Sequence, residues 1–278
     1  MTLLLTAAAL TALIHFINTL ALSVRVSGVR THRLATAASL YNVVFLLAST
    51  ANSVLAPLMA AINERVINSG SAPGAALLSV GQLGGLEGQG RIILGAATVG
   101  TVIGALCIPA FVVFFTRAIG LFEETGSVPR LIGRLLLSPR VTSGLPPLPG
   151  GETSGSPPAK SLPIPKTFLI LNALVAGLYT TGVLSAVFAG ALNPETRQTA
   201  ITLSPLINGF ATVLLAAVVD PTAASITDQA MNGERDGEDV KRMAFYLSGS
   251  RIAGTVLAQA LFLPAAYVVK NAAIILCR

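Results

Sequence analysis

Apolar runs dominate the pattern of hydrophobic and polar positions along this chain. Six stretches consist mostly of apolar and small side chains, and each ends at polar, charged or turn residues: 3–24, 34–62, 92–115, 168–192, 199–219 and 252–269. About 20 consecutive apolar residues are enough for an α-helix to cross the hydrocarbon core of a bilayer. The pattern therefore predicts an all-α polytopic membrane protein with six transmembrane helices.

The composition supports the same class of protein. Hydrophobic residues make up 53% of the 278 residues and charged residues 11%, whereas about 25% is charged in an ordinary soluble domain. The net charge is +6 and tryptophan is absent. Because the basic residues lie mainly beside apolar runs, where they set topology, we expect membrane lipids and no nucleic acid as partners.

A proline-rich segment divides the six spans three and three. Residues 139–166 hold eight of the sixteen prolines, a composition that predicts a disordered linker. It separates a first three-helix half, residues 1–138, from a second half, residues 167–278. A second polar stretch, residues 228–242, predicts a solvated loop or a short helix.

The distribution of Lys and Arg predicts the orientation, because cytoplasmic loops accumulate these residues. Five of the eighteen fall on the side that carries both termini: Arg65, Arg91, Arg197, Lys270 and Arg278. Thirteen fall on the side of the linker: Arg25, Arg30, Arg33, Arg117, Arg130, Arg134, Arg140, Lys160, Lys166, Arg235, Lys241, Arg242 and Arg251. We therefore expect a cytoplasmic linker and extracellular termini.

The third and sixth spans resemble each other. Both carry Gly-Thr-Val, at 100–102 and 254–256, and both continue to a proline, Pro109 and Pro264. Two three-helix units of this kind would cross the membrane in opposite directions, which is the frame of many alternating-access transporters. Chance recurrence in spans rich in Ala, Gly and Val explains the likeness equally well.

Signatures of catalysis are missing from the sequence. The two histidines, His15 and His32, form no H-E-x-x-H zinc motif, and the chain has neither a G-x-S-x-G elbow nor a Walker A loop. We expect no enzyme activity, no metal and no cofactor.

Polar side chains at membrane depth are the remaining candidates for function, because they usually face the protein interior or a wet cavity. Hydrogen bonds between helices explain each one singly, but together they predict a hydrophilic interior. His15 and Asn18 share a helix face. For His15, a role as a proton relay is the alternative to a role in the cavity wall. Asp220 precedes Pro221 and is predicted to cap the next helix, with a proton or cation site as the alternative. The set comprises His15, Asn18, Asn42, Thr50, Asn52, Ser53, Asn172, Asn208 and Gln259.

A dense basic cluster lies where the first span meets the cytoplasm. It contains Arg25, Arg30 and Arg33, with Gly28 favouring a tight turn between them. Positive-inside orientation explains such a cluster. The functional alternative is a phosphate trap, because guanidinium groups bind phosphate oxygens bidentately and stay charged at any working pH.

The run from residue 13 to residue 58 resembles the alternate lipid II flippase family of bacteria (Amj, alternate to MurJ). Its most specific parts include Ile-His-Phe at 14–16, Ser-Val-Arg at 23–25, Gly-Val-Arg-Thr at 28–31, Thr-Ala-Asn at 50–52 and Ala-Pro-Leu at 56–58. The six spans and the length also fit the family. Two departures stand out, since many relatives are expected to carry an acidic residue near Asn18 and an Arg near Ser49.

The resemblance implies a lipid II flippase of the bacterial cytoplasmic membrane. Such a protein moves the undecaprenyl-pyrophosphate-linked peptidoglycan precursor from the inner to the outer leaflet. The expected substrate-binding residues are Arg25, Arg30 and Arg33 for capture, then His15, Asn18 and Asn52 along the path. Other small-solute or ion-coupled transporters, a membrane enzyme of polyprenyl-phosphate metabolism and a non-transporting scaffold remain alternatives, and a homo-oligomer is left open.

Overall fold

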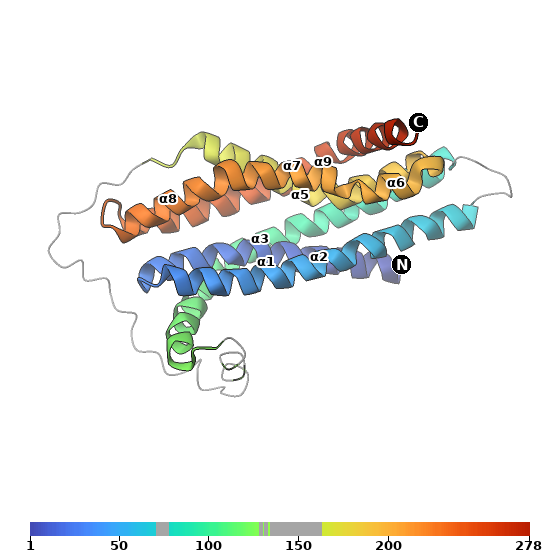
Figure 1. The fold of residues 1–278 in the computed structure, drawn as a ribbon. Coiled ribbons are helices and arrows are strands. Elements are labelled where there is room, and N and C mark those ends of the chain that lie inside the picture. The colour runs from blue at the N-terminus through green and yellow to red at the C-terminus, as the bar shows by residue number, and fades with distance from the viewer. Residues whose placement is uncertain (71–77, 128–129, 131–132, 134–162) are drawn as a thin grey trace.

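The computed structural model describes residues 1–70, 78–127, 130, 133 and 163–278, so most of the predicted linker lies outside the described residues. Long helices form a single elongated bundle (Figure 1). The principal helices are α1 (Thr2–Arg30), α2 (Leu34–Gly70), α3 (Val80–Thr125), α5 (Lys166–Leu192) and α9 (Gly237–Leu276). Between α5 and α9 the chain forms η2 (Pro194–Thr196), α6 (Arg197–Thr202), α7 (Ser204–Leu214), η3 (Leu215–Val219) and α8 (Asp220–Met231).

Six of these helical segments are long and apolar enough to cross a membrane, which confirms the predicted fold class. Each predicted span lies within one of them. The observed segments are mostly longer than the predictions; α9, for example, has 40 residues. The additional turns contain polar residues. A hydropathy pattern ends a predicted span at such residues, whereas the helix itself can continue through them.

Two helix pairs make the closest contacts in the bundle, α1 with α3 and α5 with α9. A Cβ added to Gly100 of α3 would lie 2.0 Å from the carbonyl oxygen of Ala12 in α1. A Cβ added to Gly254 of α9 would lie 2.2 Å from the carbonyl oxygen of Ala173 in α5. Small residues let helix backbones approach in this way inside a membrane. The repeated Gly-Thr pair therefore marks equivalent contacts in the two pairs, an observation that favours the predicted inverted repeat over chance.

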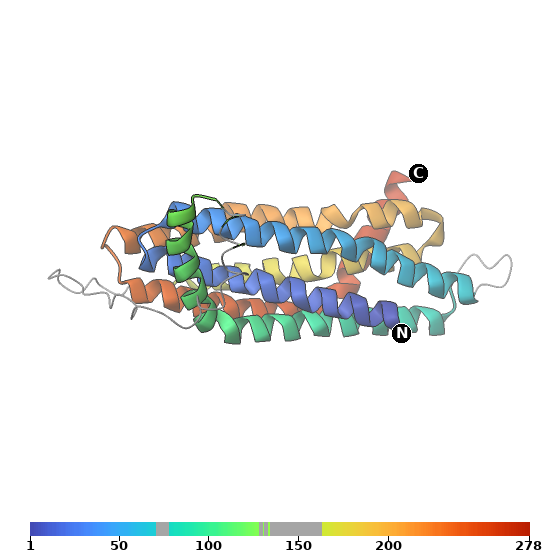
Figure 2. The same cartoon turned by 90° about the horizontal axis from the view of Figure 1, so that it is seen from below.

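Proline bends both helices that carry this pair. Pro109 lies inside α3 and Pro264 inside α9, where proline removes a backbone hydrogen bond and crowds the preceding turn. The C-terminal part of α3 turns away from the bundle axis, and the C-terminal part of α9 is bent as well (Figures 1 and 2).

The bundle has two distinct ends (Figure 1). Both chain termini, the C-terminal end of α2, the N-terminal end of α3 and the α5–α6 connection lie at one end. The α1–α2 turn and the α8–α9 turn lie at the other end. This is the arrangement that six successive crossings require, whereas the choice of which end is cytoplasmic stays a prediction.

Two local predictions are corrected by the structure. The polar stretch 228–242, predicted as a solvated loop or a short helix, is mostly helical: residues 228–231 end α8, residues 237–242 begin α9, and residues 232–236 connect the two. Within it Arg235 and Asp239 are buried and form an ion pair at 3.5 Å, so each neutralises the other. Asp220 does not cap a helix, because the chain is already helical before it. The π-helical turn η3 accommodates Pro221 there, and the Asp220 N–H bonds to the Leu215 carbonyl.

Candidate functional site

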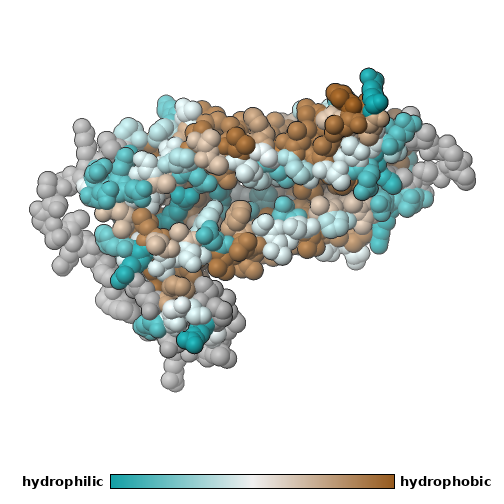
Figure 3. Space-filling model, viewed as in Figure 1, coloured by the Kyte–Doolittle hydropathy of each residue, from teal (hydrophilic) through white to brown (hydrophobic). Residues whose placement is uncertain are grey.

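A cavity of about 200 Å³ lies midway along the bundle, between α1, α2, α5, η3 and α9. A volume of this size holds on the order of ten waters. The space-filling view shows the molecule hollowed between α2 and α7 (Figure 3). The cavity is lined by Ile14, His15, Asn18, Thr19, Ala21, Tyr41, Phe45, Ala48, Ser49, Asn52, Thr101, Asn172, Val175, Ala176, Tyr179, Leu215, Arg251 and Thr255.

Three of the predicted site residues meet in the wall of this cavity. His15 and Asn18 come from α1 and Asn52 comes from α2. Thr101 and Thr255, from the two Gly-Thr pairs, lie in the same wall and are almost fully buried. The cavity therefore brings polar side chains from both halves of the chain together, within a wall whose surface is mostly apolar.

The other polar residues predicted at membrane depth contact neighbouring helices. Asn172 is buried and its amide donates to the Leu247 carbonyl at 3.2 Å and to the Ser250 hydroxyl at 2.6 Å, so it ties α5 to α9. Gln259 donates to the Arg91 carbonyl and joins α9 to α3. Asn208 packs against Gly182, where an added Cβ would lie 1.9 Å from its Oδ1 atom.

Three polar residues of α2 do not face the interior as predicted: Asn42, Thr50 and Ser53 are exposed on the bundle surface. The hydroxyl groups of Thr50 and Ser53 donate to carbonyls one turn earlier in their own helix. This internal hydrogen bond lets a hydroxyl face lipid at low cost, and the sequence alone does not reveal it.

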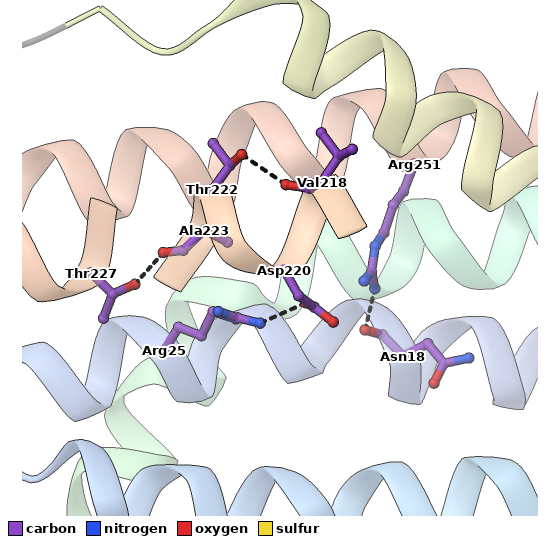
Figure 4. A network of polar contacts seen from close by, with 8 residues as sticks. All are labelled: Asn18, Arg25, Val218, Asp220, Thr222, Ala223, Thr227 and Arg251. Atoms are coloured by element: carbon purple, nitrogen blue, oxygen red, sulfur yellow. Dashed lines mark hydrogen bonds and ion pairs between the residues drawn. The ribbon is translucent and has the colours of Figure 1, made fainter. Parts of the chain in front are cut away.

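Arg251 lines the cavity although its position in the sequence did not mark it as a site residue. The hydrophobic pattern predicts that it lies in the loop before the sixth span, but it lies inside α9. Its Nη1 atom donates to the backbone carbonyl of Asn18 in α1 (Figure 4). The run of charged residues at the start of α9 ends at Arg242, and this signal indicates that the sixth span can begin before Arg251. Without Arg251, the basic residues of the loops still favour a cytoplasmic linker, so the predicted orientation is unchanged.

Arg25 reaches across the bundle to Asp220, and the two form an ion pair next to the cavity (Figure 4). The Arg25 Nη2 atom donates to the Asp220 Oδ1 atom at 3.0 Å. The guanidinium also lies 5.9 Å from the centre of the Tyr41 ring. The Arg25 and Asp220 side chains are 26% and 47% exposed, so neither is enclosed by the protein.

The predicted cluster of three arginines is divided in the structure. Arg30 and Arg33 are exposed at the α1–α2 turn, at the end of the bundle. Arg30 follows Arg25 by five residues, which places it about 140° around the helix and about 7.5 Å further along. Gly28 lies within α1 rather than in a turn; an added Cβ would be 2.8 Å from the Ala37 Cβ, so this glycine lets α1 and α2 approach.

The cavity opens sideways, through an apolar surface. Phe45 of α2 lines the cavity and is 50% exposed. Tyr179 of α5 also lines it, and its hydroxyl lies 2.5 Å from the Thr212 hydroxyl of α7. The helices α2 and α7 beside this opening carry exposed large apolar side chains: Leu46, Leu47 and Val54 on α2, and Leu206, Phe210 and Val213 on α7. A polar interior thus communicates with a surface suited to lipid chains.

The described residues contain no group of three or more His, Cys, Asp or Glu side chains that could hold a metal ion. The chemistry that the site offers is therefore hydrogen bonding by amides and hydroxyls, together with the charges of Arg25, Arg251 and Asp220.

Comparison with known proteins gives one coherent answer. The family model for Amj, alternate to MurJ, matches residues 10–273. The lipid II flippase Amj of Bacillus subtilis (strain 168) is 37% identical over 256 residues, which cover 92% of this chain and 91% of that protein. No solved structure matches the chain.

Proposed function

Because the chain belongs to the Amj (alternate to MurJ) family, we propose that it is a lipid II flippase of the bacterial cytoplasmic membrane. It would move the undecaprenyl-pyrophosphate-linked precursor from the inner to the outer leaflet. In doing so it would supply peptidoglycan synthesis, and with it cell wall biogenesis and cell shape. The observation that carries the proposal is a polar cavity at membrane depth that opens sideways to lipid.

The physical task of a flippase explains why such a cavity is needed. A large polar, anionic head group must cross about 30 Å of hydrocarbon while its tail stays among the lipid chains. The amides and hydroxyls of the cavity wall can replace water around sugar and peptide groups. The apolar surfaces of α2 and α7 beside the opening can accommodate the polyprenyl tail.

The proposed path uses the six residues selected from the sequence. Arg30 and Arg33 lie exposed at the end of the bundle that we propose to be cytoplasmic, where they can capture the diphosphate. Arg25 lies further in, and His15, Asn18 and Asn52 line the cavity beyond it. The termini would then be extracellular, as the distribution of basic residues predicts.

The size of the cavity indicates that the described conformation is closed. About 200 Å³ is below the 300–1,000 Å³ of sites that enclose drug-sized ligands, and a disaccharide-pentapeptide is larger than a drug. Passage therefore requires the opening beside Phe45 to widen. Helices α2 and α7 border this opening and belong to neither of the two tightest pairs, α1 with α3 and α5 with α9, so widening requires α2 and α7 to separate.

Growth of cells depleted of their main lipid II flippase tests the proposal. The chain should restore growth at an expression level at which an unrelated six-span protein does not. A failure to restore growth by protein that is correctly inserted, together with absence of lipid II translocation in proteoliposomes, would contradict it. Turnover of polyprenyl pyrophosphate by the purified chain would favour the alternative of an enzyme, and translocation of an unrelated solute would favour another transporter.

A further inference from the structure

We propose that Arg251 and Arg25 together form the anion-binding site of the cavity, and that Asp220 occupies Arg25 until a lipid diphosphate displaces it. The inference rests on the proposed function, since it assigns the site that would recognise the diphosphate of lipid II. It differs from the phosphate trap predicted at the α1–α2 turn, because it places recognition at membrane depth and adds a residue from the other half of the chain.

The first observation is that Arg251 has unused hydrogen-bonding capacity. A guanidinium has five N–H donors, and in the structure Arg251 donates through Nη1 to one backbone carbonyl. Among the residues that the structure describes, no carboxylate forms an ion pair with it. A charged group without a counter-ion inside a membrane is costly, so an anion that enters the cavity gains from meeting this guanidinium.

The second observation is the charge balance around the cavity. Arg251 interacts electrostatically with the Tyr41 side chain, with Arg25, which it repels, and with Asp220, which attracts it. Two guanidinium groups thus share one carboxylate, and one positive charge is left uncompensated among these three side chains. A single carboxylate serves this pair of cations, whereas a diphosphate diester brings two negative charges.

The third observation is the weak hold of Asp220 on Arg25. One nitrogen and one oxygen make the contact at 3.0 Å, rather than the two parallel bonds of a bidentate pair. The Asp220 side chain is 47% exposed, so it can turn into the wet region when it is released. The π-helical turn directly before Asp220 interrupts the regular α-helix at this position, and such turns are common at functional sites.

These features predict a preference for the number of charges on the ligand. A lipid with a single negative charge, such as a phosphodiester, can satisfy Arg251 while Asp220 stays on Arg25. A lipid diphosphate can satisfy both guanidinium groups once Asp220 has left. The ligand class is therefore a lipid with at least two anionic charges close together, and zwitterionic or singly charged membrane lipids should bind less tightly.

The test measures binding by the full-length chain in detergent, with two probes: undecaprenyl diphosphate, and phosphatidylglycerol, whose phosphodiester carries a single negative charge. Arg251→Gln should weaken diphosphate binding by about tenfold or more, the value of a lost charged hydrogen bond, and should reduce the preference for the diphosphate over phosphatidylglycerol. Asp220→Asn should tighten diphosphate binding, because it frees Arg25 from its competitor. Arg242→Gln, which removes the same charge nine residues earlier in the same helix, should bind as the parent does.

The Asp220→Asn variant decides between a site and a structural ion pair, because misfolding cannot increase affinity. Unchanged diphosphate binding by Arg251→Gln, or weaker binding by an Asp220→Asn variant that elutes as the parent does in size-exclusion chromatography, would overturn the proposal. Failure of the proposed function is distinguishable: the parent would then bind the diphosphate with the predicted variant pattern but would not restore growth of flippase-depleted cells.

Discussion

The close contact between α1 and α3 leads to a sharp stability prediction. Replacing Gly100 by Ala would place a Cβ 2.0 Å from the Ala12 carbonyl oxygen and 2.8 Å from the Ala12 Cα. Ordinary van der Waals contact begins near 3.4 Å, so the two helices must separate by more than an ångström along backbone that has no flexible end to move. Overpacking of this kind typically costs about 1–3 kcal/mol.

Helix propensity acts in the opposite direction and must be subtracted. Gly to Ala inside a helix contributes up to about 1 kcal/mol in favour of the helix. Gly95 provides the matched control, because it lies in the same helix and an added Cβ meets nothing within 4 Å. We therefore expect Gly95→Ala to be neutral or stabilised and Gly100→Ala to be destabilised. The gain in helix propensity is common to both variants, so they should differ by the overpacking cost alone, about 1–3 kcal/mol.

Unfolding of the purified variants by SDS titration in mixed micelles measures this difference. The same comparison is available in the second half, where Gly254 faces the Ala173 carbonyl at 2.2 Å and Gly249 has no neighbour within 4 Å. Equal stability of Gly95→Ala and Gly100→Ala would refute the close approach of α1 and α3. A destabilised Gly100→Ala beside an unaffected Gly254→Ala would refute the equivalence of the two pairs.

Four further outcomes are expected. Asn172→Ala should lower the free energy of unfolding by about 1–3 kcal/mol, because it removes the two hydrogen bonds that the Asn172 amide donates across to α9, to the Leu247 carbonyl and the Ser250 hydroxyl. SDS titration measures this free energy, and an unchanged midpoint would show that these bonds do not hold α5 to α9. Exposed Cys277 should react with a membrane-impermeant thiol reagent in intact cells and Cys277→Ser should remove that signal; labelling of Cys277 solely after permeabilisation would reverse the orientation. Changing Arg30 and Arg33 together to Lys should weaken lipid II transport in proteoliposomes, compared at equal amounts of protein, by about 1–2 kcal/mol for each bidentate arginine–phosphate pair that the change removes. Unchanged transport would show that these two residues only set the orientation of the helix. Deletion of residues 141–162 should leave transport intact, since their composition cannot bury enough apolar surface to fold; inactivity of an inserted deletion variant would contradict this.

Hydropathy was sufficient to predict the six spans because the bilayer sets one simple length requirement. It could not decide which face of each helix points inward. In a soluble helix the polar face marks the solvent side, whereas a membrane helix is apolar on both its lipid face and its packed face. Asn42 and Asn52 lie in the same predicted span, yet Asn52 lines the cavity and Asn42 is exposed.

The Gly-Thr pairs show how far a local pattern can go. Their recurrence in the third and sixth spans is visible in the sequence, and Gly100 with Gly104 also forms the small-xxx-small spacing that favours close helix packing. The spacing predicts that a partner helix comes close. It does not identify α1 as that partner, because the partner is decided by the complementary surface around Ala12.

Long-range charge pairing was beyond the reach of the sequence for a different reason. Arg25 and Asp220 are 195 residues apart, and each has a sufficient local explanation: a topology signal for Arg25 and a helix cap for Asp220. Both explanations use neighbours in the chain, while the interaction that forms uses neighbours in space. The same holds for Arg251, because a position in a cytoplasmic loop explains this arginine from the sequence alone. An arginine near a span boundary becomes a functional candidate when it lies inside the helix and forms no ion pair with a carboxylate. The unpaired charge is then costly inside a membrane, and an anionic ligand lowers that cost.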